Sequence, residues 1–391
     1  MRRGLLLLLS SGSLVACALV IGLEAPPTAE AIDAAVDSGN TFDTAADTRV
    51  PEVAPEAAVD STVPDASCAR CLRGGCEAGR CLPFVVEVQP GGAFASAAAE
   101  GTVVWIELGG APPVRWAPTD GGAARARTVV SPSAAYAVAT GGGWLFFGSG
   151  GGGVQSCLLP ACDPERIEAV DPDVSLPTFL ARDELGTLYW TNDGLLRAAK
   201  ASHLVRYSGG TAVAIAKLTS MPRAGLAVDD QTAYFDELRA GGGSNLLAVP
   251  RGASVGATPI VVYASPTGIR AIAVDASGVY VSDATGITFL AKTGGVVPAG
   301  IVGKNLVSSA TIGGLATFGK RLYAIDQGTK PSDGAVWSCD PTDCTPVKLM
   351  SGLNTPTALS VDESSVYVGV LRPFPVDGGG AADGAFLQVV R

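Results

Sequence analysis

Seven copies of a short apolar strand recur along this chain of 391 residues, at intervals of 42 to 46 residues. Each copy has an aromatic or bulky apolar residue at its centre. The centres are Val104, Phe146, Tyr189, Tyr234, Tyr280, Tyr323 and Tyr367. A steady period of this length, with several short strands and glycine-rich turns in each unit, is typical of a β-propeller with one four-stranded blade per repeat. The sequence therefore predicts an all-β fold with a seven-bladed propeller, and six or eight blades are the alternatives.

The two ends of the repeat region also have strand character. Residues 83–89 (PFVVEVQ) precede the first full repeat, and residues 385–391 (AFLQVVR) follow the last. A ring of blades has no open edge if its last blade is completed by a strand from the other end of the repeat region. We expect the strand at 83–89 to pair beside the last strand and close the ring.

The N-terminus has the pattern of a secretory signal, because Arg2 and Arg3 precede an apolar run that begins at Leu5. The run leads into residues 14–17, and LVAC resembles the lipobox of bacterial lipoproteins. By this resemblance Cys17 becomes the first residue of the mature chain and carries acyl chains, palmitate among them. Ordinary secretion through the A-x-A site around Cys17 is the second interpretation. An uncleaved signal anchor of about 20 apolar residues is the third.

The number of cysteines agrees with a lipid anchor. The nine are Cys17, Cys68, Cys71, Cys76, Cys81, Cys157, Cys162, Cys339 and Cys344. With Cys17 set aside, eight remain, which is an even number that can pair completely in an oxidising compartment. The sequence thus predicts an envelope protein, anchored in the membrane through Cys17 and secreted if the lipobox is not used. By resemblance, Ala18 after the anchor implies the outer membrane.

Between the signal and the first disulfide candidates lies an acidic segment, residues 24–67. It carries ten acids against Arg49 alone, a net charge of −9 out of −10 for the whole chain. Without a hydrophobic period it is typical of a disordered, self-repelling tether. The remainder is near neutral, so a basic nucleic-acid footprint is absent. The predicted domains are a signal peptide (1–16), the anchor and tether (17–67), a small cysteine-rich module (68–82) and the propeller (83–391).

Two kinds of cysteine motif follow the tether. Cys68, Cys71, Cys76 and Cys81 are spaced closely enough to ligate zinc, but behind a secretory signal two disulfides are favoured, with their pairing left open. Inside the repeats, Cys157 with Cys162 and Cys339 with Cys344 each form S-C-x4-C and predict staples across the turn between the outer strands of a blade. A redox dithiol is the alternative, but the spacing differs from CxxC.

One repeat resembles a known family. Residues 188–192 (LYWTN) resemble a copy of the YWTD repeat, and AVDASGVYVSD (273–283) resembles the wider class that includes NHL-type propellers. The match covers roughly residues 83–391 at the level of period and pattern. The layout of lipobox, acidic tether, cysteine module and propeller resembles surface lipoproteins of Gram-negative bacteria.

Acids recur at fixed places around the strand centres. Four aspartates stand five or six residues before a centre, and Asn192, Asp283 and Asp326 stand three after one. Carboxylates repeated around a ring could meet at the axis and bind a metal. The role we favour is local, because Asp and Asn before a tight turn bond to the backbone of that turn.

Catalysis has little support in the sequence. His203 is the only histidine, and a lone polar residue on a strand is more often solvated than a general base. We assign no catalytic residue, metal ligand or cofactor. The predicted function is that of a membrane-anchored binding or scaffolding lipoprotein whose propeller loops bind a protein, peptide or glycan. The alternative is a metal-dependent propeller enzyme of the lyase or lactonase type.

Overall fold

The chain divides into two units, Met1–Pro64 and Asp65–Arg391, and all residues described below belong to the second. The computed structural model describes residues 76–77, 80–81, 84–89, 92–107, 114–119, 127–129, 134–150, 153–162, 168–171, 176–192, 202–220, 222–300, 302–309, 311–372 and 384–390. The predicted signal peptide, the anchor Cys17, the tether, Cys68 and Cys71 all lie outside the described residues.

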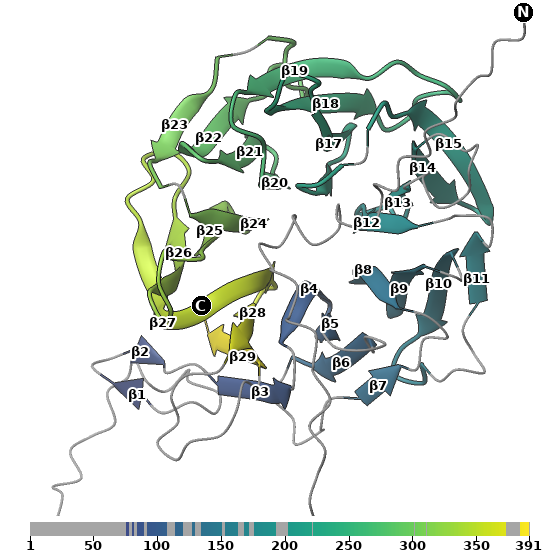
Figure 1. The fold of residues 1–391 in the computed structure, drawn as a ribbon. Coiled ribbons are helices and arrows are strands. Elements are labelled where there is room, and N and C mark those ends of the chain that lie inside the picture. Colours follow the sequence, from purple (N-terminus) through teal and green to yellow (C-terminus); the bar gives the residue numbers. More distant parts are fainter. Residues whose placement is uncertain are drawn as a thin grey trace, which may run out of the picture. The chain divides into compact units, whose positions relative to one another are not determined.

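Five antiparallel sheets of four strands follow one another along the chain (Figure 1). The first contains β4 (Ala93–Ala99), β5 (Thr102–Glu107), β6 (Val114–Pro118) and β7 (Arg127–Val129). The second contains β8 (Ala135–Gly141), β9 (Trp144–Ser149), β10 (Gly153–Leu158) and β11 (Glu168–Asp171). The third contains β12 (Pro177–Arg182), β13 (Leu188–Asn192), β14 (His203–Ser208) and β15 (Thr211–Lys217). The fourth contains β16 (Leu226–Val228), β17 (Thr232–Leu238), β18 (Ser244–Pro250) and β19 (Ile260–Ser265). The fifth contains β20 (Ala271–Val274), β21 (Gly278–Asp283), β22 (Gly286–Ala291) and β23 (Lys304–Val307).

The sixth propeller sheet has seven strands. They are, in order, β24 (Ile312–Phe318), β25 (Arg321–Asp326), β26 (Gly334–Cys339), β27 (Val347–Val361), β28 (Ser365–Arg372), β29 (Gly384–Val390) and β3 (Phe84–Gln89). The first half of β27 pairs with β26 and its second half with β28. The described strands therefore form six propeller sheets and not the seven separate ones expected from the repeats, because β27 runs through from one set of strands into the next.

The first strand of each four-stranded sheet lies innermost in the ring (Figure 1). Successive innermost strands contact one another from β4 through β8, β12, β16, β20 and β24 to β27, and β27 contacts β4. The predicted closure is confirmed, because β3 pairs antiparallel with β29, with Val88 opposite Ala385. A short hairpin, β1 (Cys76–Glu77) with β2 (Arg80–Cys81), pairs Cys76 with Cys81 across its two strands.

Hydrophobic clusters fill the spaces between neighbouring sheets. The second strand of each repeat supplies the large fully buried side chains, Trp105, Trp190 and the central tyrosines among them. At the junction of the first and last repeats, the Phe386 ring stacks on Trp105 at 4.5 Å between centroids and on Tyr367 at 6.2 Å. Such stacking adds to the hydrophobic gain from burying these rings. The junction thus has side-chain packing as well as the β29–β3 ladder.

Helices are absent from the described residues. Accordingly, none of the described residues belongs to a helix of the length and apolar character required to cross a membrane.

Candidate functional site

The repeated acids lie on two opposite faces of the propeller. Antiparallel pairing places the beginning of each innermost strand beside the end of the second strand, as Ala93 is opposite Glu107 and Ile312 opposite Asp326. We call this face the start face, and the face with the tight turns between first and second strands the turn face. Asn192, Asp283 and Asp326 end second strands on the start face, whereas the acids of the turn face are Asp183, Asp229, Asp275 and Asp362.

On the turn face the aspartates hold their own turns. The Oδ1 atom of Asp275 accepts backbone hydrogen bonds from Ser277 (2.8 Å) and Gly278 (3.0 Å), and Oδ2 accepts one from the Tyr280 hydroxyl (2.9 Å). Asp183, Asp229 and Asp362 bond to their turns in the same way. Burial, together with the Asp275 carboxylate, raises the pKa of Tyr280. The predicted turn role of these acids is confirmed.

The repeats that lack this aspartate use another turn. Their first and second strands are joined by two residues that both have positive φ, namely Glu100–Gly101, Gly142–Gly143 and Gly319–Lys320. Positive φ at both central positions defines a type I′ turn, whose twist suits a tight hairpin without help from a side chain. The aspartate is thus needed only where the turn is longer.

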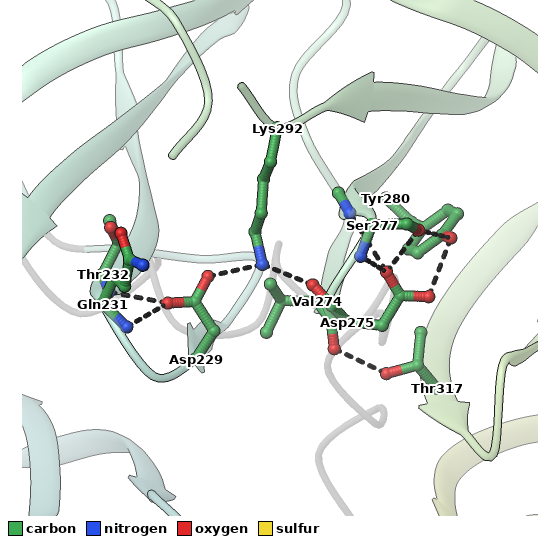
Figure 2. Close-up of polar contacts among 10 residues, drawn as sticks. Asp229, Gln231, Thr232, Val274, Asp275, Ser277, Tyr280, Lys292 and Thr317 are labelled. Atoms are coloured by element: carbon green, nitrogen blue, oxygen red, sulfur yellow. Dashed lines mark hydrogen bonds and ion pairs between the residues drawn. The ribbon is translucent and has the colours of Figure 1, made fainter. Parts of the chain in front are cut away.

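A buried lysine connects two neighbouring sheets on the turn face. Figure 2 shows Lys292, just after β22, between Asp229 of the fourth sheet and the backbone of Asp275 in its own sheet. Lys292 Nζ lies 2.7 Å from Asp229 Oδ2 and also donates to the Asp275 carbonyl, and both charged side chains are at least 92 % buried. Arg251 and Asp183 make the corresponding contact one sheet earlier, at 3.2 Å. Each ion pair joins two neighbouring sheets, and each charge is neutralised by its partner inside the protein.

Acids of the start face are also bonded to nearby loops or to the neighbouring sheet. Asp283 accepts from the Ser265 hydroxyl at 2.6 Å and from the Thr285 backbone at 2.7 Å. Asp326 accepts from Thr311 and from the Gly328 backbone. Among the described residues, no three His, Cys, Asp or Glu side chains gather closely enough to hold a metal ion.

Asp236 on the start face differs from the other acids. Its side chain is fully buried, and Oδ1 accepts backbone hydrogen bonds from Arg223 (2.9 Å) and Ala224 (2.7 Å). Its Oδ2 atom has no hydrogen-bond partner. Burial disfavours the charged form and raises the pKa of Asp236 to about 6, although the backbone donors act in the opposite direction.

A mainly apolar cavity of about 250 Å³ opens between innermost strands at the start face. Residues near the beginning of three innermost strands line it, and β27 contributes two residues near its C-terminal end. The lining residues are Phe94, Ala95 and Ser96 of β4, Tyr136, Ala137 and Val138 of β8, Thr178, Phe179 and Leu180 of β12, and Ala358 and Leu359 of β27. Tyr136 is 42 % exposed. The Ser96 hydroxyl is buried without a hydrogen-bond partner, and Thr178 shares a 2.8 Å hydrogen bond with Thr191. The cavity offers apolar contact and few polar groups.

Sequence reasoning did not single out these lining residues. One sequence feature could have indicated them. A bulky residue stands near the beginning of these innermost strands, as Phe94 does among the small residues of AFASAAA and Phe179 does in PTFLAR. Ala271 and Ala273 of β20 are examples of small buried residues on another innermost strand, although Ile272 lies between them and Ile312 opens β24.

The remaining predicted residues have structural surroundings. Both predicted staples are confirmed, since Cys157 bonds to Cys162 and Cys339 to Cys344, and each bridge joins the end of the third strand of its repeat to the turn that follows. The sole histidine, His203, is partly buried at the beginning of β14, and its backbone N–H donates to Asn192 Oδ1 at 2.6 Å. The Cys76 and Cys81 backbones are paired, and the partners of their thiols remain a prediction.

Comparison with known proteins supports the fold class. No family model and no curated protein matches the chain. The computationally designed protein Ika8 is similar with a TM-score of 0.50 at 14% identity, over 78% of this chain and 98% of that one. PorZ, a surface component of the type-IX secretion system of Porphyromonas gingivalis, gives 0.51 at 14% identity, over 74% of this chain and 46% of PorZ. A gluconolactonase from Xanthomonas campestris gives 0.46 at 14% identity, over 84% and 93%. At these identities the likeness to Ika8 and PorZ shows a similar fold alone and no activity.

Proposed function

We propose that this protein is a binding or scaffolding lipoprotein of the cell envelope, whose propeller binds a peptide or protein segment at the start face. The observation that carries the proposal is the open apolar cavity between the innermost strands, with Phe94, Phe179 and Leu180 in its walls. A peptide would insert one apolar side chain there, in the way that a buried anchor residue supplies most of the affinity at a protein interface.

The lining favours a peptide over a glycan. The lining side chains carry three hydroxyls, those of Ser96, Tyr136 and Thr178, and Thr178 is already bonded to Thr191. Sugars carry many hydroxyls, and each one that is buried without a partner costs binding free energy. An apolar peptide side chain has no such requirement.

The alternative of a metal-dependent enzyme has less support. A metal at the axis would need several oxygen ligands within reach of one ion. The start-face carboxylates of Asp283 and Asp326 instead accept hydrogen bonds from nearby loops and, for Asp283, from Ser265 of the preceding sheet. We therefore favour the binding function.

We also propose that the seven-stranded sheet is two blades, giving seven blades in all. Val347–Leu353 of β27 belongs to one ladder and Asn354–Val361 to another. Gly352 and Thr355, near the junction of the two ladders, have positive φ. A bend between the two blades would lie at this position. The chain of contacts between innermost strands would then pass through seven positions.

Attachment to the outer membrane through Cys17, with the acidic segment as a spacer, is part of the same proposal. One residue that carries several acyl chains suffices for stable anchoring. Cys17→Ser should move the protein from the detergent phase to the aqueous phase in a phase-partition assay. A mature N-terminus elsewhere than residue 17, measured by mass spectrometry, would refute the anchor, and a start at Leu19 would favour simple secretion.

The binding proposal can be tested with two matched variants. Peptides are selected on the full chain by phage display, and the affinity of the best peptide is measured for Phe179→Ser and for Leu185→Ser. Leu185 is 76 % exposed in the turn after β12, on the turn face. We expect Phe179→Ser to weaken binding at least about tenfold, as for loss of an anchor side chain, and Leu185→Ser to leave it unchanged.

Two results would contradict the proposal. Equal effects of the two variants would place the peptide away from the cavity. Failure to select any peptide, together with specific binding to a glycan array that Phe179→Ser abolishes, would assign the cavity to glycans.

A further inference from the structure

A second cavity, of about 320 Å³, lies between the sheet that contains β22 and the sheet that contains β25. Ile287 and Val307 form its wall on one side, and Leu322, Ala324 and Trp337 form the wall on the other. Ser308 and Pro346 also line the cavity and are exposed, so it opens to solvent. Its volume is at the lower end of the range for small-molecule sites, about 300–1,000 Å³. No residue of this cavity lines the start-face cavity.

The repeat pattern explains why there is space at this position. The residue just after each strand centre is buried in all repeats and packs between neighbouring sheets. These residues are Trp105, Phe147, Trp190, Phe235, Val281, Ala324 and Val368. Only the sixth repeat has alanine there, where four others have an aromatic ring. Protein interiors are normally packed without gaps, and a missing side chain leaves a cavity that costs stability. The absent side chain of repeat six therefore creates a vacancy that a ligand could fill.

The lining includes an acceptor for one hydrogen bond. Asp326 Oδ1 is bonded to Thr311 and Gly328, whereas its Oδ2 atom has no hydrogen-bond partner among the described residues. The rest of the wall is mainly apolar and includes the Trp337 ring, but the cavity is also lined by Ser308, Ser309 and Ser338. Lys348 Nζ lies 4.7 Å from the centroid of that ring, which holds the indole in place by a cation–π contact.

We propose that this cavity is a binding site for a compact, mostly apolar molecule of one or two rings that carries a hydrogen-bond donor. The rings would occupy the volume that an aromatic side chain fills in other repeats, against Leu322 and Trp337. The donor would be directed to Asp326. The site does not depend on the peptide site, because the two cavities share no residue.

The probes are indole and indene, which have nearly the same shape but differ in that only indole has an N–H donor. Binding of each to the full chain is measured by calorimetry and by the shift in melting temperature. We expect both to bind, with indole about fivefold tighter, as for one net hydrogen bond. If neither probe binds up to its solubility limit, the proposal is overturned. If indole and indene bind with equal affinity, the role of Asp326 as hydrogen-bond acceptor is overturned.

Two variants separate the apolar part of the site from the polar part. Ala324→Phe restores the residue type of Phe147 and Phe235 and should weaken both probes at least tenfold. Asp326→Asn keeps an oxygen for Thr311 and Gly328, and should remove the preference for indole while leaving indene unaffected.

Folding of each variant is checked by circular dichroism. If Ala324→Phe does not fold, Ala324→Val, which has the side chain of Val281 and Val368, should give a smaller loss of the same kind. Unchanged affinity in a folded Ala324→Phe variant would mean that the probes bind elsewhere and would refute the site.

Discussion

Replacement of Asp236 by asparagine should change how the stability of the protein depends on pH. Burial raises the pKa of Asp236 from 3.8 to about 6. Because the folded pKa lies above the unfolded one, this group favours folding at low pH, and its contribution is lost as the pH rises through about 6. At about 1.36 kcal/mol per pKa unit the whole shift corresponds to about 3 kcal/mol, of which about 2 kcal/mol should be lost from the free energy of unfolding of the wild type between pH 4 and pH 7.

Asparagine keeps Oδ1 as acceptor for the Arg223 and Ala224 backbones but does not ionise. Its amide NH2 replaces the unpartnered Oδ2, and burying that donor adds a penalty of about 1–3 kcal/mol that is independent of pH. The quantity to measure is therefore the free energy of unfolding of the variant minus that of the wild type, followed as a function of pH. This difference should move by about 2 kcal/mol in favour of Asp236→Asn from pH 4 to pH 7.

Urea unfolding followed by tryptophan fluorescence measures both free energies at each pH. Asp283→Asn is the matched control, because Asp283 is also buried on the start face but both of its oxygens accept hydrogen bonds. That variant should lose about 1–3 kcal/mol at pH 7, since the Ser265 hydroxyl loses its acceptor. Parallel stability profiles for the wild type and Asp236→Asn between pH 4 and pH 7 would refute the reasoning.

Three further changes test how the propeller is held together. Lys292→Met should lower the free energy of unfolding in urea by about 3 kcal/mol or more, since it leaves Asp229 buried without its counter-charge. The double variant with Asp229→Asn should recover part of this loss, and no recovery would argue against a stabilising ion pair between Lys292 and Asp229. Deletion of residues 83–89 should expose the edge of β29 and cause aggregation, measured by light scattering. Deletion of residues 25–66 should leave the melting temperature unchanged, and an equal loss of stability in both deletions would contradict closure of the ring by β3. Replacing the Cys339–Cys344 staple by two serines should lower stability by about 2 kcal/mol in the same unfolding assay, and no change would show that the bridge is dispensable.

The features that could be predicted from the sequence are those that repeat. The spacing of central residues such as Tyr280 gave the propeller class, and the position of Asp275 before its strand gave the turn role, because a local backbone requirement recurs in several repeats. Seven blades were expected, and the described strands form six separate propeller sheets, so the seventh blade stays a prediction. Nothing in the residues of β27 marks it as a single strand shared by two ladders, since its continuity depends on backbone geometry around Gly352.

The cavities could not be predicted in the same way, because a cavity depends on what fails to fill a space. Ala324 is unremarkable in the sequence, and its meaning comes only from comparison with Trp105 or Phe147 at the same place in other repeats. Phe94 and Phe179 come from different repeats, and only the closed ring brings them to one cavity. Both sites arise from departures from the repeat, whereas the fold arises from the repeat itself.

The pairing of β3 with β29 has a consequence for the order in which the protein can be completed. Phe84 opens β3, but its partner strand begins only at Gly384, 300 residues later. At about 5–20 residues per second, ribosomal synthesis needs roughly 15–60 s to cover that distance. During this time β3 has no partner strand. A chain that ends prematurely never supplies one, so an unpaired β3 distinguishes unfinished chains from complete ones and offers chaperones and proteases a basis for quality control.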